Sequence, residues 1–155
     1  MQVGVFSDTH GDLLRLSAAI QRAGTPDCFL HLGDYGSDAD TISAMLGIPG
    51  YAVRGNCDYA SNLPRERVVT LAGANLLLVH GDSIRSTYTL AMKAEEAHCC
   101  AVLFGHTHQP LLTASGPILI INPGSLSMPR YGSAPSFGML SIEGGNVDVK
   151  LHALS

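Results

Sequence analysis

The sequence predicts an α/β fold in which two packed β-sheets carry helices on their outer faces. In the first third of the chain, apolar runs typical of strands alternate with segments of helical periodicity, which favours parallel strands joined by right-handed crossovers. After Pro64, one helical segment and several short strands separated by turns indicate a second sheet. No repeat, low-complexity linker or clear boundary divides the sequence, so we expect one domain over residues 1–155.

The first third of the chain is expected to run β-α-β-α-β. Leu13, Leu16 and Ile20 recur at helical spacing before Gly24, and a shorter apolar stripe ends at Gly47. The strands are expected over residues 2–7, 28–32 and 51–54, and the helices over residues 11–23 and 38–46.

The rest of the chain is expected to be mostly β-structure. Gly73-Ala74 predicts a hairpin between strands 67–72 and 75–80, and an Ala-, Met-, Lys- and Glu-rich segment predicts a helix over residues 86–98. Short strands are further expected over residues 101–104, 111–114, 118–121, 137–142 and 146–151, with turns at Gly116-Pro117 and Gly144-Gly145-Asn146.

Composition favours a compact protein in a reducing compartment. With 155 residues, 46% of them hydrophobic, the chain can bury a sizeable core without disulfide bonds. The four cysteines show no C-x-x-C spacing, and the vicinal pair Cys99-Cys100 is poorly suited to a disulfide, which favours the cytoplasm. No apolar run approaches the roughly 20 residues of a membrane span. No basic segment typical of a signal peptide precedes the first strand. We therefore expect a cytoplasmic protein without a membrane partner.

The charge balance limits the class of partner. A net charge of −4 and a pI of about 5.9 argue against a general nucleic-acid surface, which requires a basic face. They do not exclude an anionic substrate, because bound divalent cations can reverse the local charge of a site.

Five polar clusters stand where apolar runs end. Strand ends that meet at one edge of a sheet would bring these polar side chains together, and His, Asp and Asn are metal-ligand types. The clusters are Asp8-Thr9-His10, Gly33-Asp34, Gly55-Asn56-Cys57-Asp58, His80-Gly81-Asp82 and Gly105-His106-Thr107-His108.

Two of these clusters contain ligand types spaced two residues apart. In an extended chain, Asp8 and His10 would point the same way, as would His106 and His108, so each pair could grip one cation. Gly105 would let the backbone approach closely. Ordinary turn composition is the alternative explanation for each pair.

The other three candidates are weak when taken singly. Gly-Asp and Gly-Asn before Asp34 and Asn56 are common turn dipeptides, and a buried His80 can be hydrogen-bonded in the core. Taken jointly, seven candidate ligands at five strand ends favour a metal site, and seven ligands suit two metal ions about 3.5–4 Å apart. Two carboxylates, two divalent cations and a hydroxide sum to a charge near +1, which suits a phosphate ester.

These motifs resemble those of the calcineurin-like metallophosphoesterase superfamily and, within it, the small YfcE-like phosphodiesterase branch. The resemblance runs from Asp8 to Phe137-Gly138, and Asn122-Pro123-Gly124-Ser125 and Arg130 also match the branch. It implies a four-layer α/β/β/α sandwich of two mixed β-sheets flanked by helices, which agrees with the element pattern.

The resemblance also implies two divalent metal ions and their ligands. One ion would be held by Asp8, His10, Asp34 and His108, and the other by Asp34, Asn56, His80 and His106, with Asp34 bridging. Mn²⁺ is the ion we expect first, and Fe, Zn and Ni are alternatives because mixed His, Asn and carboxylate ligation does not select among them.

Four residues are candidates for a catalytic role: Asn56, Cys57, Asp58 and His80. Many superfamily members have a histidine at the position of Cys57, where it helps to protonate the leaving group. A thiol with a pKa of about 8.5 is a weaker acid, so we expect lower activity on poor leaving groups unless Cys57 only packs beside the site. Asp58 either orients neighbouring groups or caps a turn.

We expect a metal-dependent phosphoesterase, and a phosphodiesterase before a phosphomonoesterase, in which a dinuclear centre activates a bridging hydroxide for in-line attack on phosphorus. The 23 residues between Asn56 and His80, and the 25 between His80 and His106, leave no room for a lid domain. The resulting open site favours phosphodiesters, and the expected partner is a small phosphoester. A homo-oligomer, either a dimer or a tetramer, is an open alternative to a monomer.

Three alternatives remain. A phosphomonoesterase acting on nucleotides or sugar phosphates would use the same site, and a nuclease would normally add a basic groove or a further domain. The alternative from another class is a non-enzymatic interaction scaffold like the retromer subunit Vps29, which shares the fold. That eukaryotic relative has lost several ligand positions, whereas all seven are filled here.

Overall fold

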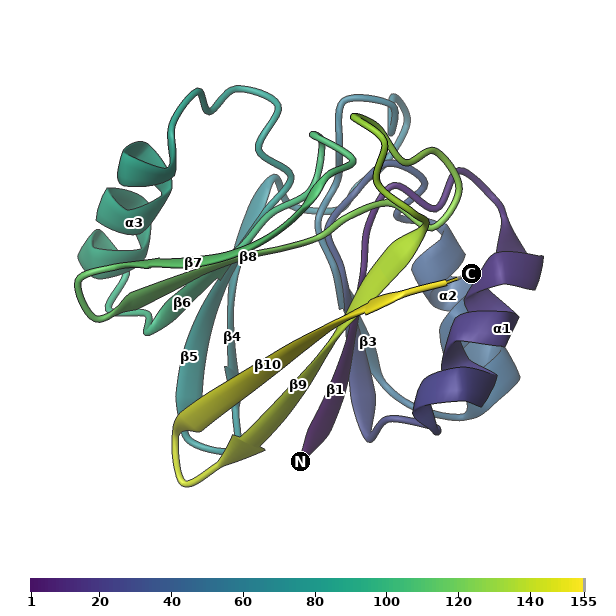
Figure 1. Ribbon diagram of the computed structural model, residues 1–155, viewed down its shortest axis with the longest axis horizontal. Coiled ribbons are helices and arrows are strands. Elements are labelled where there is room, and N and C mark those ends of the chain that lie inside the picture. Colours follow the sequence, from purple (N-terminus) through teal and green to yellow (C-terminus); the bar gives the residue numbers. More distant parts are fainter. Residues whose placement is uncertain (155) are drawn as a thin grey trace.

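The computed structural model describes residues 1–154, which form two five-stranded mixed sheets and three helices (Figure 1). The first sheet has the order β10 (Asn146–Ala153), β9 (Ser136–Glu143), β1 (Gln2–Phe6), β2 (Cys28–His31) and β3 (Gly50–Ala52). The second has the order β4 (Glu66–Leu71), β5 (Ala74–Val79), β6 (Ala101–Leu103), β8 (Ile118–Pro123) and β7 (Pro110–Ser115). The helices are α1 (Leu13–Ala23), α2 (Asp38–Leu46) and α3 (Thr87–Glu96). The predicted α/β/β/α sandwich is confirmed.

Strand direction follows the expected connections. β1, β2 and β3 are parallel neighbours, as the β-α-β-α-β pattern predicted, and β5, β6 and β8 form a second parallel set. The hairpin strands β4, β7, β9 and β10 add antiparallel pairs, so both sheets are mixed. Parallel strands end on the same side of a sheet, which gathers their following loops.

Local sequence signals set the helix ends. The Asp12 carboxylate accepts a hydrogen bond from the backbone N–H of Arg15 and caps α1, and the Ser86 hydroxyl accepts one from Thr89 and caps α3. Gly47 ends α2 in the left-handed region, at φ 67°. These caps place the helix boundaries within two residues of the predicted ones.

The first hairpin differs by one residue from the prediction. Its turn is Ala72-Gly73, with φ of 46° and 85°, rather than Gly73-Ala74. Positive φ at both central residues is typical of the type I′ turn, whose twist matches that of the flanking strands. The sequence contained the glycine, but the twist of the strands fixed its place in the turn.

The hydrophobic core forms three layers because side chains alternate along the strands. Val5 on β1 and Leu78 on β5 pack in the layer between the two sheets. Phe6 packs outward under α1 and α2, and Val79 packs outward under α3. The helices therefore cover the outer faces of the sandwich, α1 and α2 on the first sheet and α3 on the second (Figure 1).

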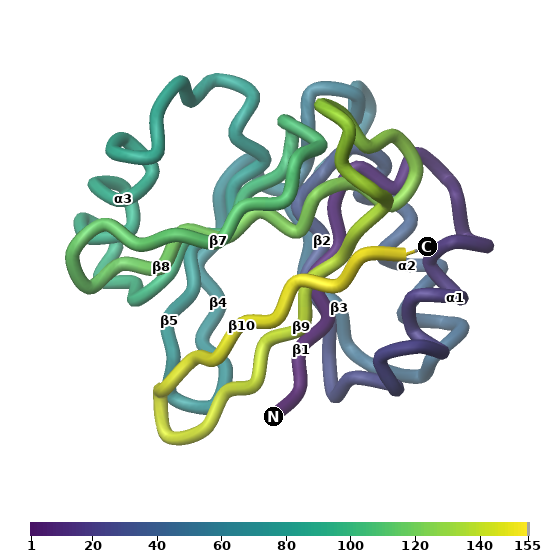
Figure 2. Tube along the Cα trace, viewed as in Figure 1, coloured from purple at the N-terminus to yellow at the C-terminus, as the bar shows by residue number. Residues whose placement is uncertain are grey.

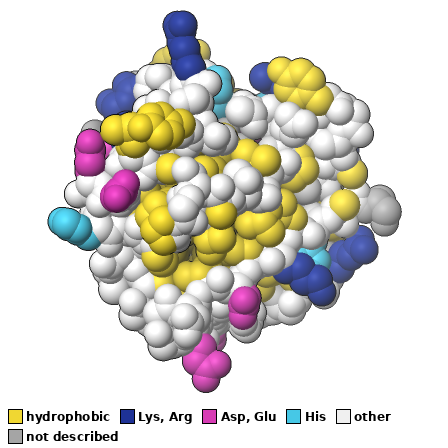
Figure 3. Space-filling view, turned by 60° about the vertical axis from the view of Figure 1, so that its left-hand side comes forward, with side chains coloured by type: hydrophobic (Ala, Val, Ile, Leu, Met, Phe, Trp, Pro, Cys, Tyr) yellow, Lys and Arg dark blue, Asp and Glu magenta, His cyan; other side chains and the backbone are white. Residues whose placement is uncertain are grey.

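The core is only partly covered along β10. Val147, Val149 and Leu151 pack against the layer between the sheets but remain partly exposed, as does Leu119 on β8. Figure 3, which brings the α3 side of the molecule forward, shows a broad hydrophobic area with charged side chains at its margins. Such surfaces are common at protein contacts, and the dimer or tetramer stays a prediction.

Within residues 1–154, the helices are all too short and polar to cross a membrane. The connections after β1, β2, β3, β5, β6 and β8 gather at one end of the sandwich, at the top of the view in Figure 2. The five polar clusters lie in or beside these connections. They come from the strand ends of both sheets, whereas we expected convergence at the edge of one sheet.

Candidate metal centre

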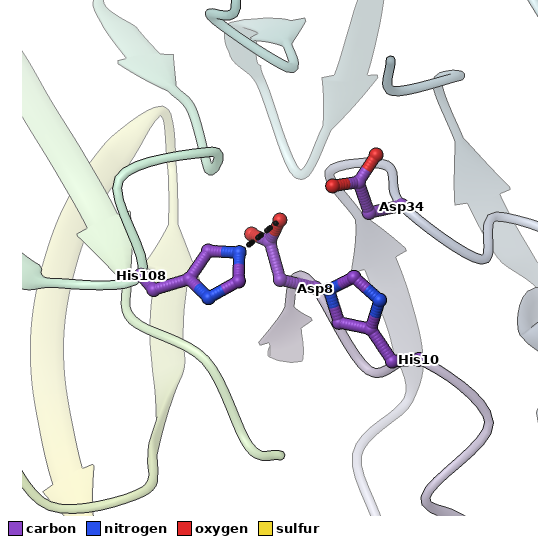
Figure 4. Close-up of side chains that lie close together, drawn as sticks. All are labelled: Asp8, His10, Asp34 and His108. Atoms are coloured by element: carbon purple, nitrogen blue, oxygen red, sulfur yellow. Dashed lines mark ion pairs between the residues drawn. The ribbon is translucent and has the colours of Figure 1, made fainter. Parts of the chain in front are cut away.

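Four predicted ligands converge at this end of the sandwich (Figure 4). Asp8, His10, Asp34 and His108 each offer one ligand atom, and these atoms all lie within 4.8 Å of one another. Asp8, Asp34 and His108 are buried and His10 is half-buried. We call these four residues the Asp8 group.

The other three predicted ligands form a second cluster that shares Asp34. The Asn56 Oδ1 atom lies 2.9 Å from His80 Nε2 and 3.1 Å from His106 Nδ1. His80 Nε2 lies 3.5 Å from Asp34 Oδ1. We call Asp34, Asn56, His80 and His106 the Asn56 group, and it is the more open of the two because Asn56 is exposed.

Backbone carbonyls orient two of the imidazole rings. His80 Nδ1 donates to Leu32 O at 2.7 Å, and His108 Nδ1 donates to Met128 O at 2.6 Å. The Nε2 atom of each ring therefore faces oxygen atoms, and for His108 the nearest is Asp8 Oδ1 at 3.1 Å. A neutral ring can only accept at Nε2, so a proton or a metal cation is needed between these atoms.

Unpartnered atoms show that the Asp8 group fits a cation. Among the described residues that are not exposed, the buried side-chain nitrogen and oxygen atoms without a hydrogen bond are Asp8 Oδ1 and His10 Nε2. Leaving such groups unpaired is costly, and both belong to ligand types that divalent cations accept. Asp8, His10, Asp34 and His108 are thus suited to hold a metal ion.

The electrostatics of the site depend on these contacts. Burial alone would raise the pKa of Asp34, but hydrogen bonds from His80 and from the Cys57 backbone N–H outweigh burial and lower it well below its ordinary value. Burial would lower the pKa of His80, but the Asp34 carboxylate raises it overall. The adjacent Asp8 carboxylate is the main cause that raises the pKa of His108. The carboxylate of Asp34 is therefore ionised at neutral pH and available to a cation.

The backbone is strained where the ligands lie. Asp8, His10, Asp34, His106 and His108 all have φ between 46° and 66°, in the left-handed region. Non-glycine residues in this region cost on the order of 1–3 kcal/mol each and cluster at functional sites. The structure therefore tolerates strain at five of the seven predicted ligand positions.

The left-handed backbone at these positions contradicts the extended geometry that we expected from the sequence. Asp8 and His10 come together, but not because the chain is extended there. His106 and His108 diverge, since His106 contacts Asn56 while His108 contacts Asp8. The assumption that two-residue spacing places both side chains on one side was wrong, because left-handed residues turn the chain between them.

Asp58 fastens two of the ligand loops together. Its carboxylate accepts hydrogen bonds from the backbone N–H groups of Asp34, Tyr35, Gly36 and Gly55 at 2.7–3.1 Å. The sequence left open whether Asp58 orients neighbouring groups or caps a turn, and its carboxylate does both. Asp58 is best described as a positioning residue for Asp34 and Asn56.

Cys57 lies beside the site with its thiol protonated. Its backbone N–H donates to Asp34 Oδ1 at 2.9 Å, and its Sγ lies 3.8 Å from Asn56 Nδ2. Burial raises the pKa of the thiol, and the nearby Asp34 charge raises it further. The thiol can donate a proton but is a weak acid at neutral pH.

Two glycines allow the loops to approach closely. A Cβ at Gly55 would clash with the Asp34 carboxylate, and a Cβ at Gly105 would clash with the Ser7 hydroxyl and reach within 2.8 Å of Asp8 Oδ2. The expected close backbone approach at Gly105 is confirmed, and these contacts explain why no larger side chain fits there.

Several supporting residues were missed from sequence. The Asp8 carbonyl accepts from Ser125 at 2.8 Å and from Ser127 at 2.9 Å, which secures the strained turn from the far end of the chain. The Asn122 amide donates to Gly105 O and to Thr107 Oγ1, both at 3.0 Å. Asn122 and Ser125 stood in the motif that matched the family branch, which was the available signal, whereas Ser127 had none.

His31 is a neutral link between two ligand loops. Thr9 Oγ1 donates to Asp38 at 2.6 Å, so His31 Nε2 must donate to Thr9 at 2.9 Å. The Gly33 backbone N–H then donates to His31 Nδ1 at 3.2 Å. Burial lowers the pKa of His31, which agrees with a neutral ring.

Comparison with known proteins identifies relatives of the whole chain. Residues 1–145 match the model of the calcineurin-like phosphoesterase superfamily domain. The chain is 31% identical over 156 residues to the probable metallophosphoesterase YsnB of Bacillus subtilis strain 168, covering 98% of this chain and 90% of the relative. It is 34% identical over 98 residues to the phosphodiesterase YfcE of Escherichia coli K12, covering 57% of this chain and 50% of that protein.

Solved structures share the fold. A predicted phosphoesterase from Streptococcus pneumoniae TIGR4 superposes with a TM-score of 0.80 and 27% identity, covering 98% of this chain and 88% of that one. Vps29 of Entamoeba histolytica, solved in complex with Zn²⁺, superposes with a TM-score of 0.78 and 20% identity, covering 99% of both chains. The similarity to Vps29 concerns the fold alone.

Proposed function

The chain belongs to the calcineurin-like phosphoesterase superfamily, and from this membership we propose that it is a phosphodiesterase that uses two divalent cations. The observation that carries the proposal is the convergence of Asp8, His10, Asp34 and His108, with two buried ligand atoms that lack hydrogen bonds. The adjoining Asn56 group supports the second cation.

We assign one cation to the Asp8 group and the other to the Asn56 group, with Asp34 shared. When bound, the two ions would neutralise phosphoryl oxygens and lower the pKa of a water nucleophile. Mn²⁺ is the ion we expect to support activity best, with Fe, Zn and Ni as alternatives. The four free cysteines support a reducing compartment, and we place the protein in the cytoplasm.

The protein's own groups prepare the site. Asp8 and Asp34 supply negative charge that attracts the cations, and backbone carbonyls hold His80 and His108 with Nε2 turned inward. Asp58 and the serines at 125 and 127 keep the ligand loops in place. Because these contacts preset the geometry, little reorganisation is needed on binding.

The open side of the site favours diesters. Asn56 is exposed and His106 half-buried, so a phosphate bound there could carry organic groups on two oxygens. By the family resemblance, Cys57 takes the position of a leaving-group acid, and the raised pKa of its thiol makes it a weak donor. We expect activated esters to be hydrolysed faster than alkyl esters. The name of the relative YfcE, a phosphodiesterase, supports the diester assignment.

The test is hydrolysis by protein stripped of metal and reloaded with single ions. We expect no turnover after chelation, best recovery with Mn²⁺ among Mn²⁺, Ni²⁺, Zn²⁺ and Mg²⁺, and faster hydrolysis of bis(4-nitrophenyl) phosphate than of 4-nitrophenyl phosphate. Undiminished activity after exhaustive chelation would refute metal dependence. Inactivity on every phosphoester with every ion would favour the scaffold alternative, and a preference for the monoester would favour a phosphomonoesterase.

A further inference from the structure

A large hollow opens beside the Asn56 group. It has a volume of about 840 Å³ and lies between the loop after β2, the N-terminal half of α2 and the loop of residues 57–63. Ligand sites for small organic molecules span roughly 300–1,000 Å³, so the hollow is large enough for a nucleoside. We call it the side hollow.

The side hollow adjoins the metal centre through residues next to the predicted ligands. Cys57 and Asp58 line it, and both contact the Asp34 loop through the hydrogen bonds described above. Tyr35 also lines it, and the ring centroid of Tyr35 lies 5.2 Å from that of His10. A group attached to a phosphate at the metal centre can therefore extend past Cys57 into the hollow.

Two tyrosines give the side hollow an aromatic lining. Tyr59 is 92% exposed and Tyr35 is 44% exposed, so neither ring contributes much to the hydrophobic core. Exposed aromatic rings in one hollow offer faces on which a flat ring can stack. Burial in the core does not explain these two side chains.

The remaining lining mixes apolar residues, such as Ala60 and Leu63, with polar ones and carries little positive charge. Ser61 and Asn62 offer hydrogen-bond donors and acceptors. Arg67 is held with its guanidinium 5.1 Å from the centroid of the Tyr51 ring, while the nearby Asp40 is acidic. This lining suits an uncharged, flat group with a polar edge better than an acyl chain or a second phosphate.

We propose that the side hollow binds the nucleobase of a mononucleotide diester whose phosphate lies at the metal centre, with Tyr59 and Tyr35 stacking on the base. The inference rests on the proposed phosphodiesterase function and names its substrate class. A net charge of −4 argues against the basic face that a nucleic-acid polymer would need, so the expected substrate is a small nucleotide ester.

The test compares two diesters that differ only in the base. Methyl thymidine 5′-phosphate carries thymine, and its abasic counterpart, the 5-(methyl phosphate) diester of 1,2-dideoxyribose, has hydrogen in place of the base. We expect the Mn²⁺-loaded wild type to prefer the thymidine ester in kcat/KM. Tyr59→Ala should reduce this preference roughly 5- to 30-fold, as expected for loss of one aromatic–base stack.

Matched variants separate stacking from general effects. Tyr59→Phe keeps the aromatic face and should retain the preference. Tyr88→Ala removes another exposed tyrosine, 68% exposed and located on α3 over the other sheet, and should also retain the preference. An unchanged preference in Tyr59→Ala, or an equal loss in Tyr88→Ala, would overturn the inference while leaving the phosphodiesterase proposal intact.

A binding experiment tests the base site even if the protein does not hydrolyse the ester. Saturation-transfer NMR should show contact between the protein and the thymine protons of methyl thymidine 5′-phosphate in wild type and Tyr59→Phe, and much weaker contact in Tyr59→Ala. If no ion supports turnover, this result would sustain the base site while the proposed function fails. Equal saturation in all three proteins, or none in wild type, would refute the base site.

Discussion

The two halves of the candidate metal centre differ in burial and in how their atoms are satisfied. In the Asp8 group, Asp8, Asp34 and His108 are buried, and Asp8 Oδ1 and His10 Nε2 have no hydrogen bond. In the Asn56 group, Asn56 is exposed and its Oδ1 already lies within 3.1 Å of two imidazole nitrogens. A bound cation would relieve the energetic cost of buried polar atoms without partners only in the Asp8 group. We therefore expect the Asp8 group to hold its ion more tightly, and the Asn56 group to exchange its ion.

The largest effect is expected from Asp34→Asn, because Asp34 alone belongs to both groups. The amide keeps the shape but removes the charge that would serve both cations. Loss of several kcal/mol of charge stabilisation corresponds to a fall in kcat/KM on the order of 10³-fold. Activity assays and elemental analysis of the same preparation check this, with circular dichroism as the control for folding. Full activity would contradict a shared carboxylate.

The comparison between the groups is tested by His10→Ala and His106→Ala. Both should lower activity by roughly 10²-fold or more. We expect His106→Ala to keep one tightly bound ion per chain, while His10→Ala loses the tight ion. Isothermal titration calorimetry of the metal-free proteins with Mn²⁺ measures the affinity for each ion. If His106→Ala lost the tighter ion instead, the order of affinities would be reversed.

Asp58→Asn tests whether the Asp34 and Asn56 loops need the hydrogen bonds that Asp58 accepts from both of them. Replacing the carboxylate weakens four charge-assisted hydrogen bonds to backbone N–H groups, so the ligands Asp34 and Asn56 should become less well placed. Loss of such supporting contacts typically costs about 10- to 100-fold in activity or metal affinity. Asp148→Asn, an exposed position on β10, is the matched control and should behave as wild type. Equal behaviour of the two variants would deny Asp58 a positioning role.

The smallest effect is expected from Cys57→His, which changes proton donation without altering either ligand group. An imidazolium is a stronger acid than a thiol near neutral pH, so hydrolysis of alkyl diesters should rise about 10- to 100-fold relative to aryl diesters. The ratio of kcat for the two substrate classes measures this. An unchanged ratio would mean that Cys57 only packs beside the site.

The fold could be predicted from sequence because its signals are local. Apolar alternation, the caps at Asp12 and Ser86, and Gly47 fix where elements begin and end within about two residues. The one-residue difference in the first hairpin turn also has a local cause. The Ala72-Gly73 turn shifted by one residue because strand twist selects a type I′ turn, which sequence spacing does not reveal.

The site was predicted in composition but not in geometry. All seven candidate ligands lie in the two groups, yet the spacing argument failed for His106 and His108 because both are left-handed. Residues that hold the ligands, such as Ser127 and Asp38, act across long stretches of chain. Such contacts leave no periodic pattern, so sequence reasoning passed over them.

The sequence by itself determined the kinds of residue that stand at the strand ends, the order of the motifs and the layered α/β architecture. These follow from short-range propensities and from alternation of apolar and polar side chains. Only the tertiary structure decided which histidine joins which group, why Asp8 and Asp34 tolerate left-handed backbones, and that a tyrosine-lined hollow adjoins the site. Those outcomes depend on hydrogen bonds and packing between segments as distant as Asp8 and Ser127, which form only when both sheets are in place.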